Sequence, residues 1–190
     1  MIVAIDFGIT NTDVAVSNKS QYKFFSMPSK NANESFIDEI ISLIDIDITE
    51  ISQIVVTGGK SNELNESFKG VNLTKISETD AIGYGTKEIY KIENEPFITL
   101  SCGTGTACIH HQDGQFSYIG GIAVGGGTIS GLSKAILDSS SLEEITDLAL
   151  KGNRKNIDLL IGDVVNEIGI LNSNVTASNF AKLKDSNIFS

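Results

Sequence analysis

Met1-Ile-Val-Ala-Ile-Asp6-Phe-Gly8-Ile-Thr10-Asn-Thr12-Asp13 begins the chain and carries its clearest structural pattern. An apolar run at residues 2–5 ends at an acid, and a second apolar alternation follows at residues 14–16. This pattern predicts two strands joined by a tight turn, that is, a β-hairpin.

The turn of this hairpin contains residues that suit a phosphate group. Gly8 has no Cβ, so a ligand can approach the backbone closely there, and the N–H groups of such a turn can bind phosphate oxygens. Asp6, at the end of the first strand, can orient a hydrated Mg²⁺, which proteins bind through one or two carboxylates together with phosphate oxygens. The alternative is an ordinary turn whose Asp and Thr side chains bond their own backbone. This stretch alone leaves both interpretations open.

The composition limits the class of partner. The 190 residues carry a formal net charge of −10, which argues against a broad electrostatic surface for nucleic acid or an anionic membrane. Hydrophobic residues make up 41% of the chain, enough for a packed core. No window approaches the roughly 20 apolar residues of a membrane span, and no basic leader precedes the first strand. We therefore expect a cytoplasmic protein in which Cys102 and Cys108 are reduced.

A second strand–turn–strand unit follows in the other half of the sequence. The apolar residues 97–100 lead into Ser101-Cys-Gly103-Thr104-Gly105-Thr106, and residues 107–111 return. Asp113-Gly114 then favours a two-residue hairpin turn before a third strand at 116–119. Each unit thus places a glycine-containing turn between its first two strands. Two such turns that face each other can hold phosphate groups from both sides, whereas one alone cannot.

Periodicity predicts the remaining elements of the first half. We expect a strand at 21–27, a helix at 34–44, a strand at 51–57, a short helix with Leu64 and Phe68 after the turn Thr57-Gly58-Gly59-Lys60, a strand at 71–76, and a helix at 77–91 with Ser77 or Thr79 as N-cap.

A glycine-rich loop, Gly120-Gly-Ile-Ala-Val-Gly125-Gly126-Gly127-Thr128, leads into an expected helix at 129–137 with Thr128 or Ser130 as N-cap. The free N–H groups at such a helix start suit an anion or a polar ligand. The alternative is a flexible connection, but three consecutive glycines lose much backbone entropy on folding, which weighs against it. Beyond the loop we expect a helix at 139–150, a strand or helix start at 156–165, a polar stretch at 172–178 and a helix start at 179–183.

Taken together, these motifs resemble the acetate and sugar kinase, Hsp70 and actin superfamily, and within it the type II pantothenate kinases. The residues that carry the resemblance are Asp6-Phe-Gly8-Ile-Thr10, Thr57-Gly58-Gly59-Lys60, Glu78-Thr-Asp-Ala-Ile-Gly83, Gly103-Thr-Gly-Thr106, Gly121-Ile-Ala-Val-Gly-Gly-Gly-Thr-Ile-Ser-Gly-Leu132, Gly152-Asn-Arg154 with Ile157-Asp-Leu159, and Thr176-Ala-Ser-Asn-Phe180. The resemblance spans nearly the whole chain, and the order of the motifs makes it specific.

The resemblance implies ATP-dependent phosphorylation of the hydroxyl of pantothenate, the first step of coenzyme A synthesis, with Mg²⁺ as the accompanying metal and Asp6 as its carboxylate. Glu78 stands where the family has its catalytic carboxylate, a general base or an orienting group for in-line transfer. The structural alternative for Glu78 is an acid that merely favours a helix start. The phosphates of ATP are assigned to Asp6, Gly8, Thr10, Gly103, Thr104, Gly105, Gly126 and Gly127. The acceptor is assigned to Thr106, Tyr118, Gly125 and Thr128.

The resemblance also implies an α/β fold of two actin/ribonuclease-H-like lobes with mixed β-sheets. The first lobe is expected at 1–94. The second, at 95–190, is incomplete, because relatives continue beyond it with an adenosine-binding segment, and we expect the chain to be truncated. Family members are dimers through the second lobe, so a homodimer is expected here, with acyl-CoA as a further candidate ligand.

Three positions depart from the family pattern. Tyr118 replaces a basic residue that helps to hold the pantothenate carboxylate, and the loss of a charge-assisted bond weakens anion recognition. Ala107 replaces a hydroxyl residue, and Asp13 replaces a frequent lysine. Two alternative functions follow: a kinase of the same fold for another small hydroxyl acceptor, and a catalytically silent relative that binds nucleotide or acyl-CoA.

Overall fold

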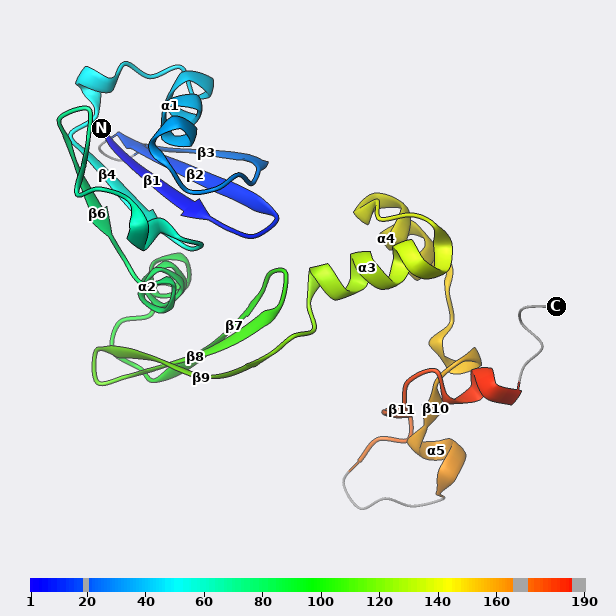
Figure 1. Cartoon of the computed structure of the whole chain (residues 1–190). Coiled ribbons are helices and arrows are strands. Elements are labelled where there is room, and N and C mark those ends of the chain that lie inside the picture. The colour runs from blue at the N-terminus through cyan, green and yellow to red at the C-terminus, as the bar shows by residue number, and fades with distance from the viewer. Residues whose placement is uncertain (19–20, 166–170, 186–190) are drawn as a thin grey trace. The chain divides into compact units, whose positions relative to one another are not determined.

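The structure is a computed structural model that describes residues 1–18, 21–165 and 171–185 (Figure 1). The chain divides into two compact units, Met1–Ile129 and Ser130–Ser190, and each is described by itself. None of the helices in the described ranges has the length and apolar character that crossing a bilayer requires.

The first unit begins with a six-stranded mixed sheet of order β3-β2-β1-β4-β6-β5. The strands are β1 (Ile2–Phe7), β2 (Asn11–Asn18), β3 (Gln21–Pro28), β4 (Gln53–Thr57), β5 (Ser67–Phe68) and β6 (Val71–Lys75). β1, β2 and β3 pair antiparallel, whereas β4 and β6 join them in parallel. The predicted hairpin is therefore confirmed, and its turn lies at the edge of the sheet where the parallel strands β1 and β4 end.

Helix α1 (Glu34–Leu43) closes one face of this sheet. The inward residues alternate along each strand, as the period of two requires: Val3, Ile5 and Phe7 of β1 are buried with Ile37 and Ile40 of the helix. Asn33 caps the helix by accepting a hydrogen bond from the Phe36 N–H. The opposite face of the strands carries the alternate residues, including Asp6.

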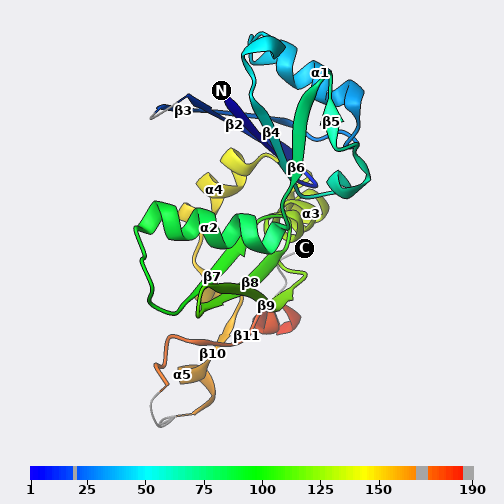
Figure 2. The same cartoon turned by 90° about the vertical axis from the view of Figure 1, so that its left-hand side faces the viewer.

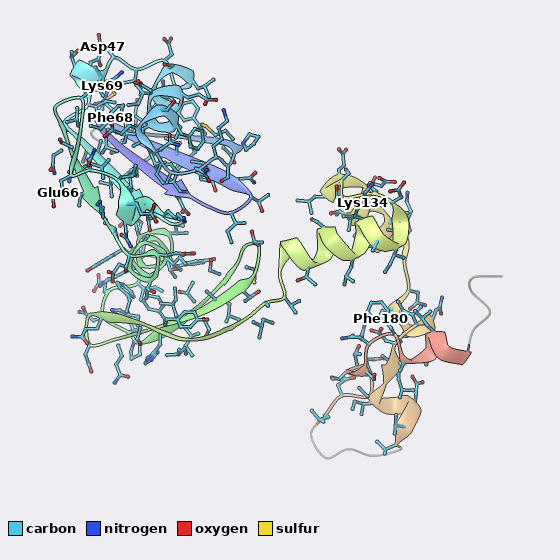
Figure 3. All side chains as sticks on the ribbon, viewed as in Figure 1. Asp47, Glu66, Phe68, Lys69, Lys134 and Phe180 are labelled. Atoms are coloured by element: carbon cyan, nitrogen blue, oxygen red, sulfur yellow. The ribbon has the colours of Figure 1, made fainter. Side chains whose placement is uncertain are left out.

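The segment between β4 and β6 differs from the prediction. Instead of a helix that contains Leu64 and Phe68, the chain forms a short 3-10 turn after β4 (η2, Ser61–Glu63), and Phe68 lies in the edge strand β5. Another 3-10 turn, η1 (Ile48–Glu50), precedes β4. Both predicted apolar residues are buried in the core, so the hydrophobic pattern was correct and its period was misassigned. Lys69, labelled in Figure 3, forms an ion pair with Asp38 of α1 and ties this edge to the helix.

Helix α2 (Glu78–Tyr90) follows β6 and packs on a three-stranded antiparallel sheet of β7 (Phe97–Cys102), β8 (Thr106–Gln112) and β9 (Gln115–Ile122) (Figure 2). The approach is close: a Cβ on Gly83 would lie 2.2 Å from the Phe116 ring. His111 is buried next to the Phe116 ring and stacks on Phe97 with ring centroids 4.7 Å apart. Asp113 and Gly114 both have positive φ, 51° and 76°, as the predicted hairpin turn requires.

Helix α3 (Gly126–Leu137) crosses from the first unit into the second. The second unit continues with α4 (Leu142–Lys151), β10 (Leu159–Leu160), α5 (Ile161–Val164) and β11 (Thr176–Ser178), with 3-10 turns η3 (Arg154–Asn156) and η4 (Ala181–Asp185). β11 lies in the stretch that we expected to be merely polar, and η4 replaces the expected helix start. Buried Asp158 organises this region, because its carboxylate accepts hydrogen bonds from the Thr176 hydroxyl and the Phe180 N–H.

The fold is thus mixed α/β, as the sequence predicts. In the described residues, the first unit has one mixed and one antiparallel sheet, and the second unit adds the antiparallel pair β10 and β11. The predicted lobe division at residues 94 and 95 falls between these sheets, after α2 and before β7. Because α2 packs on β7–β9, the compact unit extends past that point to residue 129, and the lobe division itself stays a prediction.

Candidate active site

Polar residues gather where the parallel strands of the first sheet end. Asp6 of β1 pairs with Thr57 of β4, and Glu78 begins α2 just after β6. Ligands of open α/β sheets bind outside the carboxyl ends of the strands, so this edge is the expected place for a site. Register brings a second acid to it: Asp13 lies directly opposite Asp6 on β2. Asp6, Asp13 and Thr57 line a cavity of about 600 Å³ whose other residues are mostly apolar.

The charge of Asp6 is destabilised where it stands. Partial burial raises the pKa of its carboxyl group above the ordinary 3.8, and the negative charges of Glu78 and then Asp13 raise it further. The predicted metal-binding carboxylate and the predicted catalytic carboxylate therefore interact with each other. A bound cation would relieve this repulsion.

The donor set suits Mg²⁺ only in part. Among the described residues, no group of three or more His, Cys, Asp or Glu side chains is placed to hold a metal ion by itself. Asp6, with Asp13 beside it, provides the one or two carboxylates that Mg²⁺ takes when phosphate oxygens and water supply the remaining ligands. These residues therefore fit a metal that arrives with a nucleotide.

The turn after β4 supports Asp6. Gly58 has a φ of +72°, and a Cβ there would lie 2.4 Å from the Asp6 carboxylate and 2.8 Å from the Phe7 carbonyl oxygen. Gly58 therefore lets this turn lie against the end of β1. The Thr57 Oγ1 atom is buried and, in the described part of the chain, has no hydrogen-bond partner.

The first turn, which joins β1 and β2, closes tightly. A Cβ on Gly8 would lie 2.4 Å from the Asn11 carbonyl oxygen, so the missing side chain is needed for closure of the turn itself. At the tip, the Thr10 hydroxyl lies 3.1 Å from the Thr104 hydroxyl of the second turn, within hydrogen-bonding distance. The two glycine-containing turns, 94 residues apart in sequence, therefore meet.

The second turn is held by the loop that follows β9. Gly103 N–H donates to the Gly105 carbonyl within the turn, at 2.8 Å. The N–H groups of Gly126 and Gly127 donate to the carbonyls of Gly103 and Thr104, at 2.8 and 3.1 Å. These two N–H groups, which we assigned to ATP phosphates, are thus bonded to the chain itself in this structure.

The glycines of this loop permit the close approach. A Cβ on Gly125 would lie 2.7 Å from the Thr104 carbonyl oxygen and 2.8 Å from that of Gly103. The same contacts explain why α3 begins at Gly126, earlier than predicted, because backbone carbonyls satisfy its first N–H groups in place of a side-chain cap. Thr128, one of the two predicted caps, lies inside the helix, and the prediction of a side-chain cap there was wrong.

The side chains assigned to the acceptor lie around this loop. The Thr106 hydroxyl donates to the Val124 carbonyl at 2.7 Å, and the Thr128 hydroxyl donates to the Ala123 carbonyl at 2.9 Å. Tyr118 is 61% exposed. Its hydroxyl lies over β9 at Gly121, where a Cβ would come within 2.5 Å of it. The two threonine hydroxyls therefore fix the loop, and Tyr118 offers the more accessible polar group.

Some residues that shape the site were absent from the sequence-based assignment. Gly58 was recognised in a motif but given no role, and Ser29 was not singled out. Ser29 has no sequence signal, because its contacts depend on the pairing of β2 with β3. For Gly58, the Gly-Gly pair directly after a buried strand was the available signal.

Comparisons with known proteins agree with these observations. The sequence profile of the Fumble family matches residues 8–189. The chain is 34% identical to the type II pantothenate kinase of Bacillus anthracis over 194 aligned positions, which cover 97% of this chain and 68% of that protein. It is 35% identical to that of Bacillus cereus strain ATCC 14579, over 95% of this chain and 66% of that protein. The chain thus spans about two thirds of the length of these curated relatives.

Solved structures share the fold at low sequence identity. The activator of the 2-hydroxyisocaproyl-CoA dehydratase from Clostridium difficile, with bound ADPNP, matches with a TM-score of 0.57 and 16% identity, over 84% of this chain and 59% of that one. The Lmo2764 protein of Listeria monocytogenes matches with a TM-score of 0.55 and 14% identity, over 79% of this chain and 69% of that one. At these identities the likeness concerns the fold alone, a mixed α/β fold with mixed β-sheets.

Proposed function

The chain belongs to the Fumble family of type II pantothenate kinases, and from this membership we propose that it transfers the γ-phosphate of ATP to the hydroxyl of pantothenate. The observation that supports the proposal most directly is the meeting of the two glycine-containing turns at Thr10 and Thr104. Two turns at one place can hold a nucleotide's phosphates from both sides, and Asp6 and Glu78 stand at the same sheet edge.

In the proposed reaction, the acceptor hydroxyl oxygen attacks the γ-phosphorus and forms the new P–O bond. The bond from that phosphorus to the β,γ-bridging oxygen breaks, and ADP leaves. Glu78 orients the hydroxyl and accepts its proton as the bond forms. Mg²⁺, when bound beside Asp6, would neutralise charge on the phosphates. The turns contribute by holding the reacting groups in line.

The position of Glu78 fits this role better than a purely capping role. The cap of α2 is Ser77, whose hydroxyl oxygen accepts from the Asp80 N–H at 3.1 Å. The Glu78 carboxylate is exposed and close enough to Asp6 to raise its pKa. The helix start thus has its own cap, and the Glu78 carboxylate is not needed as one.

The decisive experiment is an assay of ADP release with ATP, Mg²⁺ and pantothenate, comparing the 190-residue protein with Glu78→Gln. We expect the variant to lose about 10²- to 10⁴-fold in kcat with little change in KM for ATP, because only proton transfer and hydroxyl orientation are removed. Glu88→Gln, the same change on the exposed surface of α2, is the matched control and should leave kcat unchanged. Turnover by Glu78→Gln within twofold of the unsubstituted protein would contradict the role of Glu78.

A second acceptor is favoured by one observation. Tyr118 stands where the resemblance requires a basic residue, and its exposed hydroxyl can donate a hydrogen bond but brings no charge. An acceptor without a carboxylate would lose nothing at this position. Assays with pantothenate and with a neutral amide of it separate the alternatives, because a preference for the amide would indicate a different natural acceptor. Nucleotide or acyl-CoA binding without any turnover would indicate the silent relative.

We also propose that the protein assembles as a homodimer, on the resemblance alone. Sedimentation of the purified chain at several concentrations tests this, and a single species of 20.3 kDa would contradict it.

A further inference from the structure

One residue outside the first turn satisfies two of its carbonyl groups. Ser29 directly follows β3, and its backbone N–H donates to the Thr10 carbonyl at 3.0 Å. Its side-chain hydroxyl donates to the Gly8 carbonyl at 2.5 Å. Ser29 thus donates hydrogen bonds to the carbonyls on both sides of Ile9, those of Gly8 and Thr10.

A buried hydroxyl, that of Thr12, lies within hydrogen-bonding distance of the Ser29 side chain. The Thr12 Oγ1 atom lies 3.0 Å from Ser29 Oγ, and Thr12 is fully buried, with 0% of its surface exposed. A serine hydroxyl has one hydrogen, and Ser29 uses it on Gly8, so the Thr12 hydroxyl is the donor in this pair. The result is a directed chain of hydrogen bonds from Thr12 through Ser29 to the Gly8 carbonyl.

The direction of this carbonyl has a consequence for a phosphate ligand. In a trans peptide the C=O and the following N–H point to opposite sides of the chain. When Ser29 holds the Gly8 carbonyl, the Ile9 N–H must point away from Ser29. If this peptide flipped, the Gly8 carbonyl would point where the Ile9 N–H now points, and the negative end of its dipole would repel an anion there.

We propose that Ser29 is a positioning residue, which fixes the Gly8–Ile9 peptide so that the first turn presents an N–H group rather than a carbonyl to the phosphates of a nucleotide. The inference rests on the proposed function for its ligand. Its geometry does not depend on that function, because every contact involved lies between β2, β3 and the turn.

The test compares Ser29→Ala and Ser29→Thr with Ser42→Ala. Ser42 also donates its hydroxyl to a carbonyl, that of Asp38, but it lies in α1 away from the turn. The measurements are the dissociation constant of a non-hydrolysable ATP analogue with Mg²⁺, the KM for each substrate, and thermal unfolding.

We expect Ser29→Ala to weaken analogue binding by roughly 5- to 20-fold, because a carbonyl loses its donor and the peptide is freed. KM for the acceptor should change by less than about twofold, since the acceptor does not contact this turn in the proposed site. Ser29→Thr keeps the hydroxyl and should restore most of the affinity. Thr12→Val should weaken binding by a smaller factor, and its effect should largely vanish in the Ser29→Ala background.

A purely structural role predicts something else. Ser29→Ala would then lower the unfolding temperature, as we expect of Ser42→Ala, and leave analogue binding within twofold, which would overturn the inference. If the unsubstituted protein binds no nucleotide, the proposed function fails, and hydrogen exchange decides the positioning role. Ser29→Ala must accelerate amide exchange in residues 8–12 while Ser42→Ala does not, and unchanged exchange would overturn the inference.

Discussion

The first and second turns meet at one place but are held in shape by different means. The first has its carbonyls satisfied from outside by Ser29, whose hydroxyl is supported by buried Thr12. The second has its carbonyls satisfied by the backbone N–H groups of Gly126 and Gly127. The first turn, which also needs the missing side chain of Gly8, therefore depends in part on a side-chain hydroxyl, whereas the bonds to the carbonyls of the second come from backbone N–H groups.

This difference teaches how the same local requirement can be met at two sites with unrelated residues. In both turns carbonyls are bonded within the protein, and in the proposed site a carbonyl that faced a phosphate would repel it. A hydroxyl can be removed by a single substitution that leaves the backbone free to fold. A backbone N–H cannot be removed in this way, and the second turn is instead vulnerable to a Cβ added at Gly125, which would lie within 2.8 Å of the turn's backbone.

The largest effect is expected at Asp6, the carboxylate at the end of β1 next to the first turn. Asp6→Asn should lower kcat by about 10³-fold, because the charge that would hold Mg²⁺ beside the phosphates is lost.

The same change should alter the pH dependence of stability. The folded state raises the pKa of Asp6 above 3.8 and so keeps its proton longer than the unfolded state as pH rises. The contribution of Asp6 to the free energy of unfolding therefore decreases as pH rises from about 3.8 through the raised pKa of the folded state, and Asp6→Asn should remove this decrease.

Urea unfolding between about pH 3 and pH 7 measures this slope. Asp47→Asn is the control with the opposite sign, because hydrogen bonds from Thr49 lower the pKa of Asp47, so its contribution to stability is lost as pH falls. A slope for Asp6→Asn equal to that of the unsubstituted protein would show that burial and the charges of Glu78 and Asp13 do not raise the pKa of Asp6 in solution.

A somewhat smaller effect is expected where the second turn is built. Gly125→Ala places a methyl group within 2.8 Å of the backbone at Gly103 and Thr104, and none of these atoms can move without moving the turn. We expect a loss of about 10²-fold in kcat/KM, the usual scale for misplacement of reacting groups by about 1 Å. Steady-state kinetics measure it. Gly85→Ala, where the added Cβ meets no atom within 4 Å in the described structure, is the control. Full activity of Gly125→Ala would mean that the loop does not hold the turn in this way.

The smallest effect is expected at the contact between the turns. Thr10→Val and Thr104→Val each remove one hydroxyl of an exposed pair. An exposed hydrogen bond contributes only about 0.5–1 kcal/mol, so KM for ATP should rise by roughly two- to fivefold. The double variant should be no worse than either single variant if the two hydroxyls act through each other. Additive effects would instead indicate that each threonine contacts the nucleotide separately.

Much of the fold could be predicted because its signals are local. The alternation in β1 and β2, the apolar stripe of α1 and the Asp113-Gly114 turn each carry their structure within a few residues. The failures concern segments whose structure depends on distant partners. Phe68 follows an apolar pattern compatible with a short helix, but β6 provides an edge with which it pairs. The start of α3 was misplaced because its first N–H groups are satisfied by a turn about 20 residues earlier in sequence.

The site shows the same division. The two turns and the acids at the ends of strands could be named from glycines, threonines and carboxylates in sequence order. The bonded state of Gly126 and Gly127 could not, because free and bonded N–H groups look the same in a sequence. Nor could the role of Ser29, whose neighbours Gly8 and Thr12 reach it only through the register of β2 and β3.

The close packing of α2 on β7–β9 has a consequence for how Glu78 can move. Gly83 rests on the Phe116 ring of the second sheet, while Glu78, five residues earlier and about 7.5 Å along the helix axis, begins the same helix. A rigid helix transmits displacement along its length. Any sliding of β7–β9 against the first sheet should therefore drag the acid with it, so that the carboxylate travels with the antiparallel sheet even though it emerges from the parallel one.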